Sequence, residues 1–248
     1  MALTAYLTQT RSLLQNPGSA STSLYSDTDL TRYINLARGQ MSIEPQNSCI
    51  RALGSISTVI GQQPYLFSNI NTGVSATTGI AGVMNIRSLS YAVPGSSGAL
   101  WMSPRTWPWF SLYELNNVVP DSGPPREWAQ FAQGAGGSFY VSPLPDLAYV
   151  LSCNAVCYPI PLVDDTTVEA IPYPWTDCIP FFAAYWALLS SQTQARMADA
   201  LNYYKMYEEF SDRARKASNP DTLRWMYQQA GDPAQGPKMG ISGKAGAA

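Results

Sequence analysis

Apolar residues near the amino-terminal end of the chain recur every three to four positions, which is the period of an amphipathic helix. The first run predicts a helix that begins at Leu3 and ends before Pro17. For the second run, Ser26 is the expected N-cap, with Asp29 three residues later, and Pro45 marks the end. The apolar stripe of this second helix consists of Leu30, Tyr33, Ile34, Ala37 and Met41.

Two further helices are predicted toward the carboxyl-terminal end. Residues 175–191 are apolar on almost every side, which is typical of a helix buried between other elements. Residues 195–217 predict an amphipathic helix of about six turns, with most of its charged residues opposite the apolar face. That face consists of Ala200, Tyr203, Tyr204, Tyr207, Phe210 and Ala214.

Between the helical regions, the chain contains short runs rich in Val, Ile, Tyr and Phe, separated by Gly, Pro, Asn and Ser. Such runs predict β-strands. The glycine-rich stretches 95–98 and 134–137 predict hairpin turns or mobile loops, and the pattern of residues 106–118 indicates no particular element. The predicted strands are 55–60, 83–93, 128–133, 138–142 and 149–158.

This order of elements predicts an α+β fold. Helices from both chain ends form a bundle, a β-rich domain of sandwich-like or barrel-like form is inserted between them, and a flexible tail follows. The expected units are the N-terminal helices (1–48), the β-rich domain (49–170), the C-terminal helices (171–218) and the tail (219–248).

The charge content of the chain narrows its possible partners. Charged residues make up 13% of the 248 residues, about half the usual quarter, so much of the surface is expected to be uncharged. The formal net charge is −2, and no long basic run is present. A chain of this kind is not expected to bind DNA through its charge.

The absence of histidine excludes several kinds of site. Without it, neither a Ser-His-Asp or Cys-His catalytic arrangement nor a histidine-bound metal can form. The four cysteines are too few and too scattered for a disulfide framework, and no signal peptide opens the sequence, so we expect folding in the cytoplasm. The longest apolar stretch, 179–189, is shorter than the roughly 20 residues that span a bilayer. No membrane association, metal or cofactor is expected.

Candidate chemistry in the sequence is sparse. Cys153 and Cys157 point to one face of a predicted strand about 13 Å apart, and we interpret them as buried apolar side chains. Asp164 and Asp165, followed by Glu169 and Asp177, lack the alternating spacing of a calcium loop. A solvated loop is the favoured interpretation of these acids.

Two aromatic segments indicate protein contacts rather than catalysis, because Trp, Tyr and Arg anchor protein interfaces. The first contains Arg105, Trp107, Trp109 and Phe110, and it is predicted to pack at a subunit or domain contact. The second is the one apolar cluster in the predicted tail, and it is expected to become ordered on a partner. This cluster consists of Leu223, Trp225, Met226 and Tyr227.

Several segments, in order and spacing, resemble head-to-tail adaptor (connector, or neck) proteins of short-tailed bacteriophages. Beyond the second helix, the resemblance rests on residues 107–115, 139–149, 158–162, 171–175 and 182–192. The most continuous match is DLTRYINLAR at residues 29–38. The resemblance covers most of residues 26–217, whereas the loops 95–102 and 134–137 and the end 236–248 have no counterpart.

The resemblance implies a structural ring protein of the virion without enzymatic activity. Twelve identical subunits would lie between the capsid portal protein and the tail tube or nozzle protein. The tail would dock on the portal, the β-rich part would face the tail tube, and DNA would pass through the lumen unread during genome ejection. A weakly charged protein suits this passage, because it offers few cations to hold phosphates.

Two other functions remain open from the residues alone. A carbohydrate-binding or tail-associated β module would use Trp107, Trp109 and Trp128 as a sugar platform, and it predicts that these rings are exposed on one β face. A histidine-free hydrolase would use Asp164 or Asp165, and it predicts a cleft around these acids.

Overall fold

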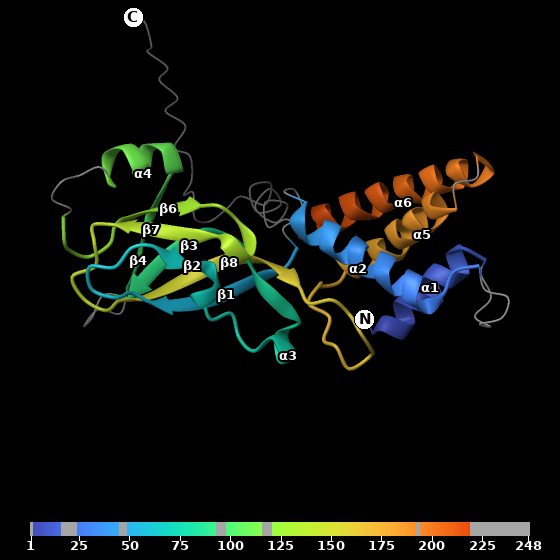
Figure 1. Cartoon of the computed structure of the whole chain (residues 1–248), viewed down its shortest axis with the longest axis horizontal. Coiled ribbons are helices and arrows are strands. Elements are labelled where there is room, and N and C mark those ends of the chain that lie inside the picture. The colour runs from blue at the N-terminus through green and yellow to red at the C-terminus, as the bar shows by residue number, and fades with distance from the viewer. Residues whose placement is uncertain are drawn as a thin grey trace, which may run out of the picture.

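The computed structural model describes residues 2–15, 24–44, 49–92, 98–115, 121–191 and 194–218, and it has the predicted α+β fold (Figure 1). The four long helices lie at one end of the molecule, and the sheets, with the two short helices, lie at the other. The helices are α1 (Leu3–Leu13), α2 (Asp27–Ile43), α3 (Ser75–Thr78), α4 (Trp107–Tyr113), α5 (Ile179–Ser190) and α6 (Gln194–Ser218). The strands are β1 (Arg51–Ser57), β2 (Tyr65–Leu66), β3 (Ile80–Ala92), β4 (Ala99–Trp101), β5 (Ser103–Arg105), β6 (Glu127–Phe131), β7 (Ser138–Ser142) and β8 (Val150–Pro159).

The four long helices form one bundle, as predicted, and α5 is its centre. This helix contacts α1, α2 and α6, and its small residues Ala183, Ala184 and Ala187 are fully buried, which lets the neighbours approach closely. A short 3-10 turn, Trp175–Cys178, precedes α5, so the predicted helix 175–191 begins a turn later than expected.

Helix α2 begins and ends where the sequence predicts. The Ser26 hydroxyl accepts a hydrogen bond from the Asp29 backbone N–H at 3.1 Å and donates one to the Asp29 carboxylate at 2.6 Å. The first of these bonds satisfies a backbone donor that the first turn of a helix leaves unpaired. The helix stops at Ile43, and Glu44 is its C-cap.

The strands form two separate four-stranded sheets, in the orders β1-β8-β3-β4 and β2-β7-β6-β5. All pairs are antiparallel except β5 with β6. Residues of both sheets, among them Leu89 and Phe139, belong to one apolar cluster that continues into the helices. Two sheets that share a core correspond to the sandwich-like form of the prediction rather than to a closed barrel.

Strand β1 is shifted from its predicted position. It covers Arg51–Ser57 rather than 55–60, because its first half pairs with β8, from Arg51 opposite Val156 to Gly54 opposite Cys153. The chain then turns away at Gly61, whose φ is 67° and whose N–H donates to the Pro145 carbonyl. Pairing with a strand about a hundred residues away is invisible to local periodicity.

For four other strands, the local sequence pattern predicts the position correctly to within a few residues. Strand β7 has the predicted bounds, and β3, β6 and β8 differ from theirs by a few residues. The glycine stretch 134–137 joins the antiparallel pair β6 and β7 through a 3-10 turn, as expected for a hairpin. Helix α4 has no counterpart among the predicted elements, although Thr106 as N-cap followed by a proline in the first turn is a helix-start signal.

Candidate functional site

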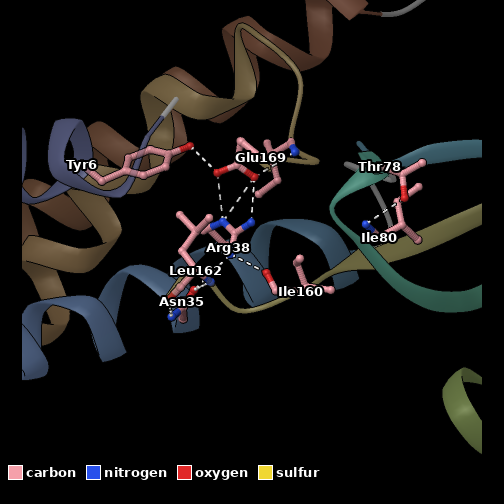
Figure 2. A network of polar contacts seen from close by, with 9 residues as sticks. Tyr6, Asn35, Arg38, Thr78, Ile80, Ile160, Leu162 and Glu169 are labelled. Atoms are coloured by element: carbon pink, nitrogen blue, oxygen red, sulfur yellow. Dashed lines mark hydrogen bonds and ion pairs between the residues drawn. The ribbon is translucent and has the colours of Figure 1, made fainter. Parts of the chain in front are cut away.

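A buried ion pair lies where the helices meet the segment that leads out of β8. Arg38 occupies the buried side of α2, four residues after Ile34 and three before Met41. Its side chain is 1% exposed, and its partner, the Glu169 side chain, is 5% exposed. Figure 2 shows the two side chains facing each other, with Arg38 on α2 and Glu169 on the segment before α5. We call Tyr6, Asn35, Arg38 and Glu169 the junction network.

The ion pair itself is bidentate. Arg38 Nη2 donates to Glu169 Oε1 at 2.8 Å, and Arg38 Nε donates to Glu169 Oε2 at 3.0 Å. Arg38 Nη1 donates to the Ile160 carbonyl at 2.8 Å and to Asn35 Oδ1 at 3.0 Å. The paired geometry and the additional acceptors satisfy a guanidinium that would otherwise be costly to bury.

The junction network also holds α1 and the segment that follows β8 in place through hydrogen bonds. Tyr6 of α1 donates its hydroxyl to Glu169 at 2.9 Å, while Asn35 exchanges two hydrogen bonds with the backbone of Leu162. The Ile160 N–H donates to the Gly79 carbonyl, next to the start of β3. Glu169 therefore connects α1 with α2, while Arg38 and Asn35 connect α2 with the segment that follows β8.

The chemistry of this network is structural. Burial, followed by the negative charge of Glu169, raises the pKa of the Tyr6 hydroxyl well above its usual value, so the phenol stays protonated and donates. The Glu169 carboxylate accepts from Arg38, Tyr6 and the Ile171 N–H. With its acceptor sites directed to protein donors, the carboxylate is a connector between elements rather than a catalytic base.

Asp164 and Asp165 are exposed, as the solvated-loop interpretation predicts, whereas that interpretation is wrong for Glu169, whose side chain is buried. Asp164 accepts hydrogen bonds from the backbone and hydroxyls of Thr166 and Thr167, and these bonds lower the pKa of its carboxyl group. Asp165 accepts from the Thr4 hydroxyl and, at 2.7 Å, from the Thr4 N–H in the first turn of α1. Asp164 thus shapes its own turn, and Asp165 helps to hold the amino-terminal end of α1.

The predicted interface residues are brought together on α4 and the strand before it. Arg105, at the end of β5, pairs with Glu127 of β6 and lies 4.7 Å from the Trp109 ring centre. Trp107 packs against Phe131 and Tyr140, with ring centres 4.7 and 4.9 Å apart. Arg105 is exposed, and both Trp107 and Trp109 are partly exposed. We call Arg105, Trp107 and Trp109 the α4 surface.

Phe110 does not belong to this surface. It is fully buried beneath α4, on the side that faces Tyr140. A helix places residues three apart on the same face, so Phe110 points to the same side as Trp107, which also packs against Tyr140. The expectation that Phe110 itself contacts a neighbouring subunit is therefore wrong for this conformation.

The predicted sugar platform is also wrong. Trp128 is only 4% exposed and belongs to the apolar core, whereas Trp107 and Trp109 lie on a helix. The three rings therefore do not share an exposed β face. Sequence alone did not separate them because each has aromatic or apolar neighbours along the chain.

Cys153 and Cys157 are buried packing residues, as predicted. Cys153, Cys157 and Cys178 are fully buried, Cys49 is partly buried, and all four are free thiols. Burial raises the pKa of Cys153 and Cys178 to about 12, so both remain protonated near neutral pH. Within the described ranges, no group of three or more acids or cysteines is placed to hold a metal ion.

The junction network was not predicted from the sequence. Its signal was an arginine placed inside the apolar stripe of α2, because a charged residue at a buried helical position needs a buried partner. The partner is 131 residues away, so its identity could not be inferred from spacing. The predicted tail anchors Leu223, Trp225, Met226 and Tyr227 lie outside the described residues.

None of the helices in the described part of the chain is long and apolar enough to cross a membrane.

The structural role of these residues agrees with the comparisons with known proteins. A comparison with curated proteins found no match. A family model described as SU10 adaptor protein matches residues 1–232, which is nearly the whole chain. The chain therefore belongs to the SU10 adaptor family, whose members are structural phage proteins and not enzymes.

Proposed function

We propose that this chain is the subunit of a ring that joins the capsid portal to the tail tube or nozzle of a short-tailed phage. The observation that carries the proposal is the family match over residues 1–232. An adaptor binds other virion proteins, and a position between two assemblies of rotational symmetry calls for a closed ring. Twelve copies is the number that the resemblance to head-to-tail adaptors implies.

The surface of the helical bundle supports assembly. A closed ring needs two different faces on each subunit, because each copy contacts its neighbours head to tail. Large apolar side chains are exposed on two helices that each pack on α5: Leu36 and Ile43 on α2, and Met197 and Leu201 on α6. Their exposed fractions lie between 45% and 60%, which leaves substantial apolar area to bury against a neighbour.

The α4 surface is a second proposed contact between subunits. Its guanidinium and indole rings combine charge, flat area and restricted side-chain motion, which are features of residues that dominate interface energies. The exposed Leu112 and Tyr113 extend it along α4. We therefore propose Arg105, Trp107 and Trp109 as interface residues, without Phe110.

In this proposal, different parts of the subunit bind different partners. The tail docks on the portal through Leu223, Trp225, Met226 and Tyr227, and the sheets face the tail tube. DNA passes through the lumen without being read, because a chain with a net charge of −2 and few cations holds phosphates weakly. The protein is accordingly a component of the virion, made in the cytoplasm of the host.

The proposal is tested by measuring the mass of the purified protein alone and after mixing with its portal. We expect the mixture to contain a complex heavier than the portal by a multiple of the 27.0 kDa subunit. If the mass of the portal stays unchanged, and the chain alone does not assemble either, the proposal fails.

Truncation after Ser218 tests the role of the tail in the same assay. The cut keeps the Ser218 hydroxyl that accepts from Trp175 Nε1 at 3.1 Å. We expect the truncated chain to melt at nearly the same temperature as the full chain and to lose attachment to the portal. A truncated chain that unfolds, or that still binds, contradicts the assignment of portal docking to the tail.

A further inference from the structure

A groove of about 470 Å³ lies along the carboxyl-terminal half of α6, beside the end of α2. Tyr204 and Tyr207 form one wall, and the Tyr207 hydroxyl donates to Glu44 at 2.9 Å. Behind this wall, the Phe182 ring packs 4.6 Å from Tyr207, so the wall is held by the core. A groove of this size accommodates one or two large side chains. We call it the α6 groove.

The charges of the α6 groove favour a cationic segment. Glu44, Glu208 and Asp212 contribute three carboxylates, whereas Arg215 is the one cation among the groove residues. Arg215 pairs with Asp212 at 3.0 Å through Nη1. The groove therefore combines an aromatic wall with an excess of negative charge, an arrangement that fits an apolar side chain beside a basic one.

A second observation points to an occupant. Among the residues that the structure describes, the Arg215 Nε–H is buried without a hydrogen-bond partner. An unpaired buried donor costs about 1–3 kcal/mol, and a carbonyl or carboxylate of a segment in the groove would satisfy it. Arg215 lies three residues before the end of α6, so the segment that follows Ser218 is close enough along the chain to supply this acceptor.

We propose that, in the free subunit, residues 223–225 of the same chain bind in the α6 groove. The sequence there is Leu-Arg-Trp, so Leu223 and Trp225 meet the tyrosine wall while Arg224 pairs with Glu208. Pro220 disfavours a helical conformation for the residue before it, which allows the chain to reverse direction after α6.

The reach of the chain agrees with this placement. Measured along the helix, the groove extends about 5 to 21 Å back from Ser218, at the level of Arg215 to Tyr204. An extended chain allows Leu223 to travel about 17 Å and Trp225 about 24 Å from Ser218. Another open cleft on α6 begins at Tyr203, about 23 Å back along the helix, which is beyond the reach of Leu223 and at the limit of the reach of Trp225. The inference does not depend on the proposed ring, since it concerns the isolated chain.

Hydrogen exchange of the full chain tests the inference. It is measured by mass spectrometry under conditions where the protein has the mass of one subunit. We expect the amides of residues 223–227 to exchange at least about tenfold more slowly than in a synthetic peptide of residues 219–232. Equal rates in the chain and the peptide would overturn the proposal. Slowing that appears only as concentration and mass increase would place the segment in a neighbour's groove, which also overturns it.

Reversing the charges of Glu208 and Arg224 tests whether the α6 groove is the binding site. We expect Glu208→Lys to abolish the slowing and Arg224→Glu to do the same, whereas the two changes together restore it. Glu209→Lys is the matched control, because Glu209 is exposed on α6 but does not line the groove. Equal effects of Glu208→Lys and Glu209→Lys, with melting temperatures unchanged, would show that the α6 groove is not the binding site.

Discussion

At the residue scale, the buried Glu169 carboxylate joins α1, α2 and the segment leading to α5. Removing one member of a buried ion pair leaves the other charge without compensation. The junction network is therefore a point where a small chemical change has a large effect on stability.

Glu169→Gln tests this point with almost no change in shape. We expect the free energy of unfolding to fall by about 3–5 kcal/mol, because the Arg38 charge stays buried beside a neutral amide. Asp27→Asn is the matched control: Asp27 pairs with Arg11, but its side chain is 69% exposed, so the change is expected to stay within about 1 kcal/mol. Equal losses in urea unfolding of the two variants would contradict the role of the network.

The buried thiols give a second residue-scale prediction. Burial raises the pKa of Cys153 from 9.0 to about 12. Above pH 9 the unfolded chain releases this proton while the folded chain keeps it, so the stabilisation is complete below pH 9 and is lost as the pH rises toward 12. We expect the melting temperature to fall over this range, and less steeply for Cys153→Ala. Identical slopes for the two proteins would refute the prediction.

At the element scale, Gly79 fits the start of β3 against the segment that carries Glu169. Its φ is 68°, and a Cβ at this position would lie 2.3 Å from the Val168 carbonyl oxygen. Gly61 has nearly the same φ, 67°, with no atom within 4 Å of the equivalent position. Comparing the two glycines therefore distinguishes two contributions to the free energy of unfolding, one from backbone conformation and one from close packing.

Alanine at each position measures these two costs. We expect Gly61→Ala to lose about 1–2 kcal/mol from left-handed strain alone, and Gly79→Ala to lose about 1–3 kcal/mol more because backbone atoms must move apart. Thermal unfolding of the two variants supplies the comparison. A Gly79→Ala protein as stable as Gly61→Ala would mean that the contact between β3 and the 160–170 segment is loose.

Also at the element scale, local sequence predicts the elements whose stability is local. The capped start of α2, the buried α5 and the alternation of β8 follow from residues within one helix or strand. Strand β1 depends on a partner about a hundred residues along the chain, and β4 and β5 are only three residues long, so local patterns misplace the first and miss the other two. The α4 surface was found from its composition, but the inward direction of Phe110 required knowledge of the helix.

At the scale of the whole molecule, the helices from both chain ends and the inserted sheets form a body whose buried network joins its two parts. Apolar side chains remain exposed on α2, α4 and α6, on a chain with about half the usual content of charge. Burying such a surface against neighbours requires the desolvation of few charges. The low content of charged residues, together with membership in an adaptor family, supports assembly as the function.

Imaging the neck of the virion by electron cryo-microscopy tests the central claim most directly. The account predicts a closed ring of identical densities between portal and tail tube, each fitted by one copy of this chain with its helices and sheets at opposite ends. A neck in which no density fits the chain, or a chain located elsewhere in the particle, would contradict the account.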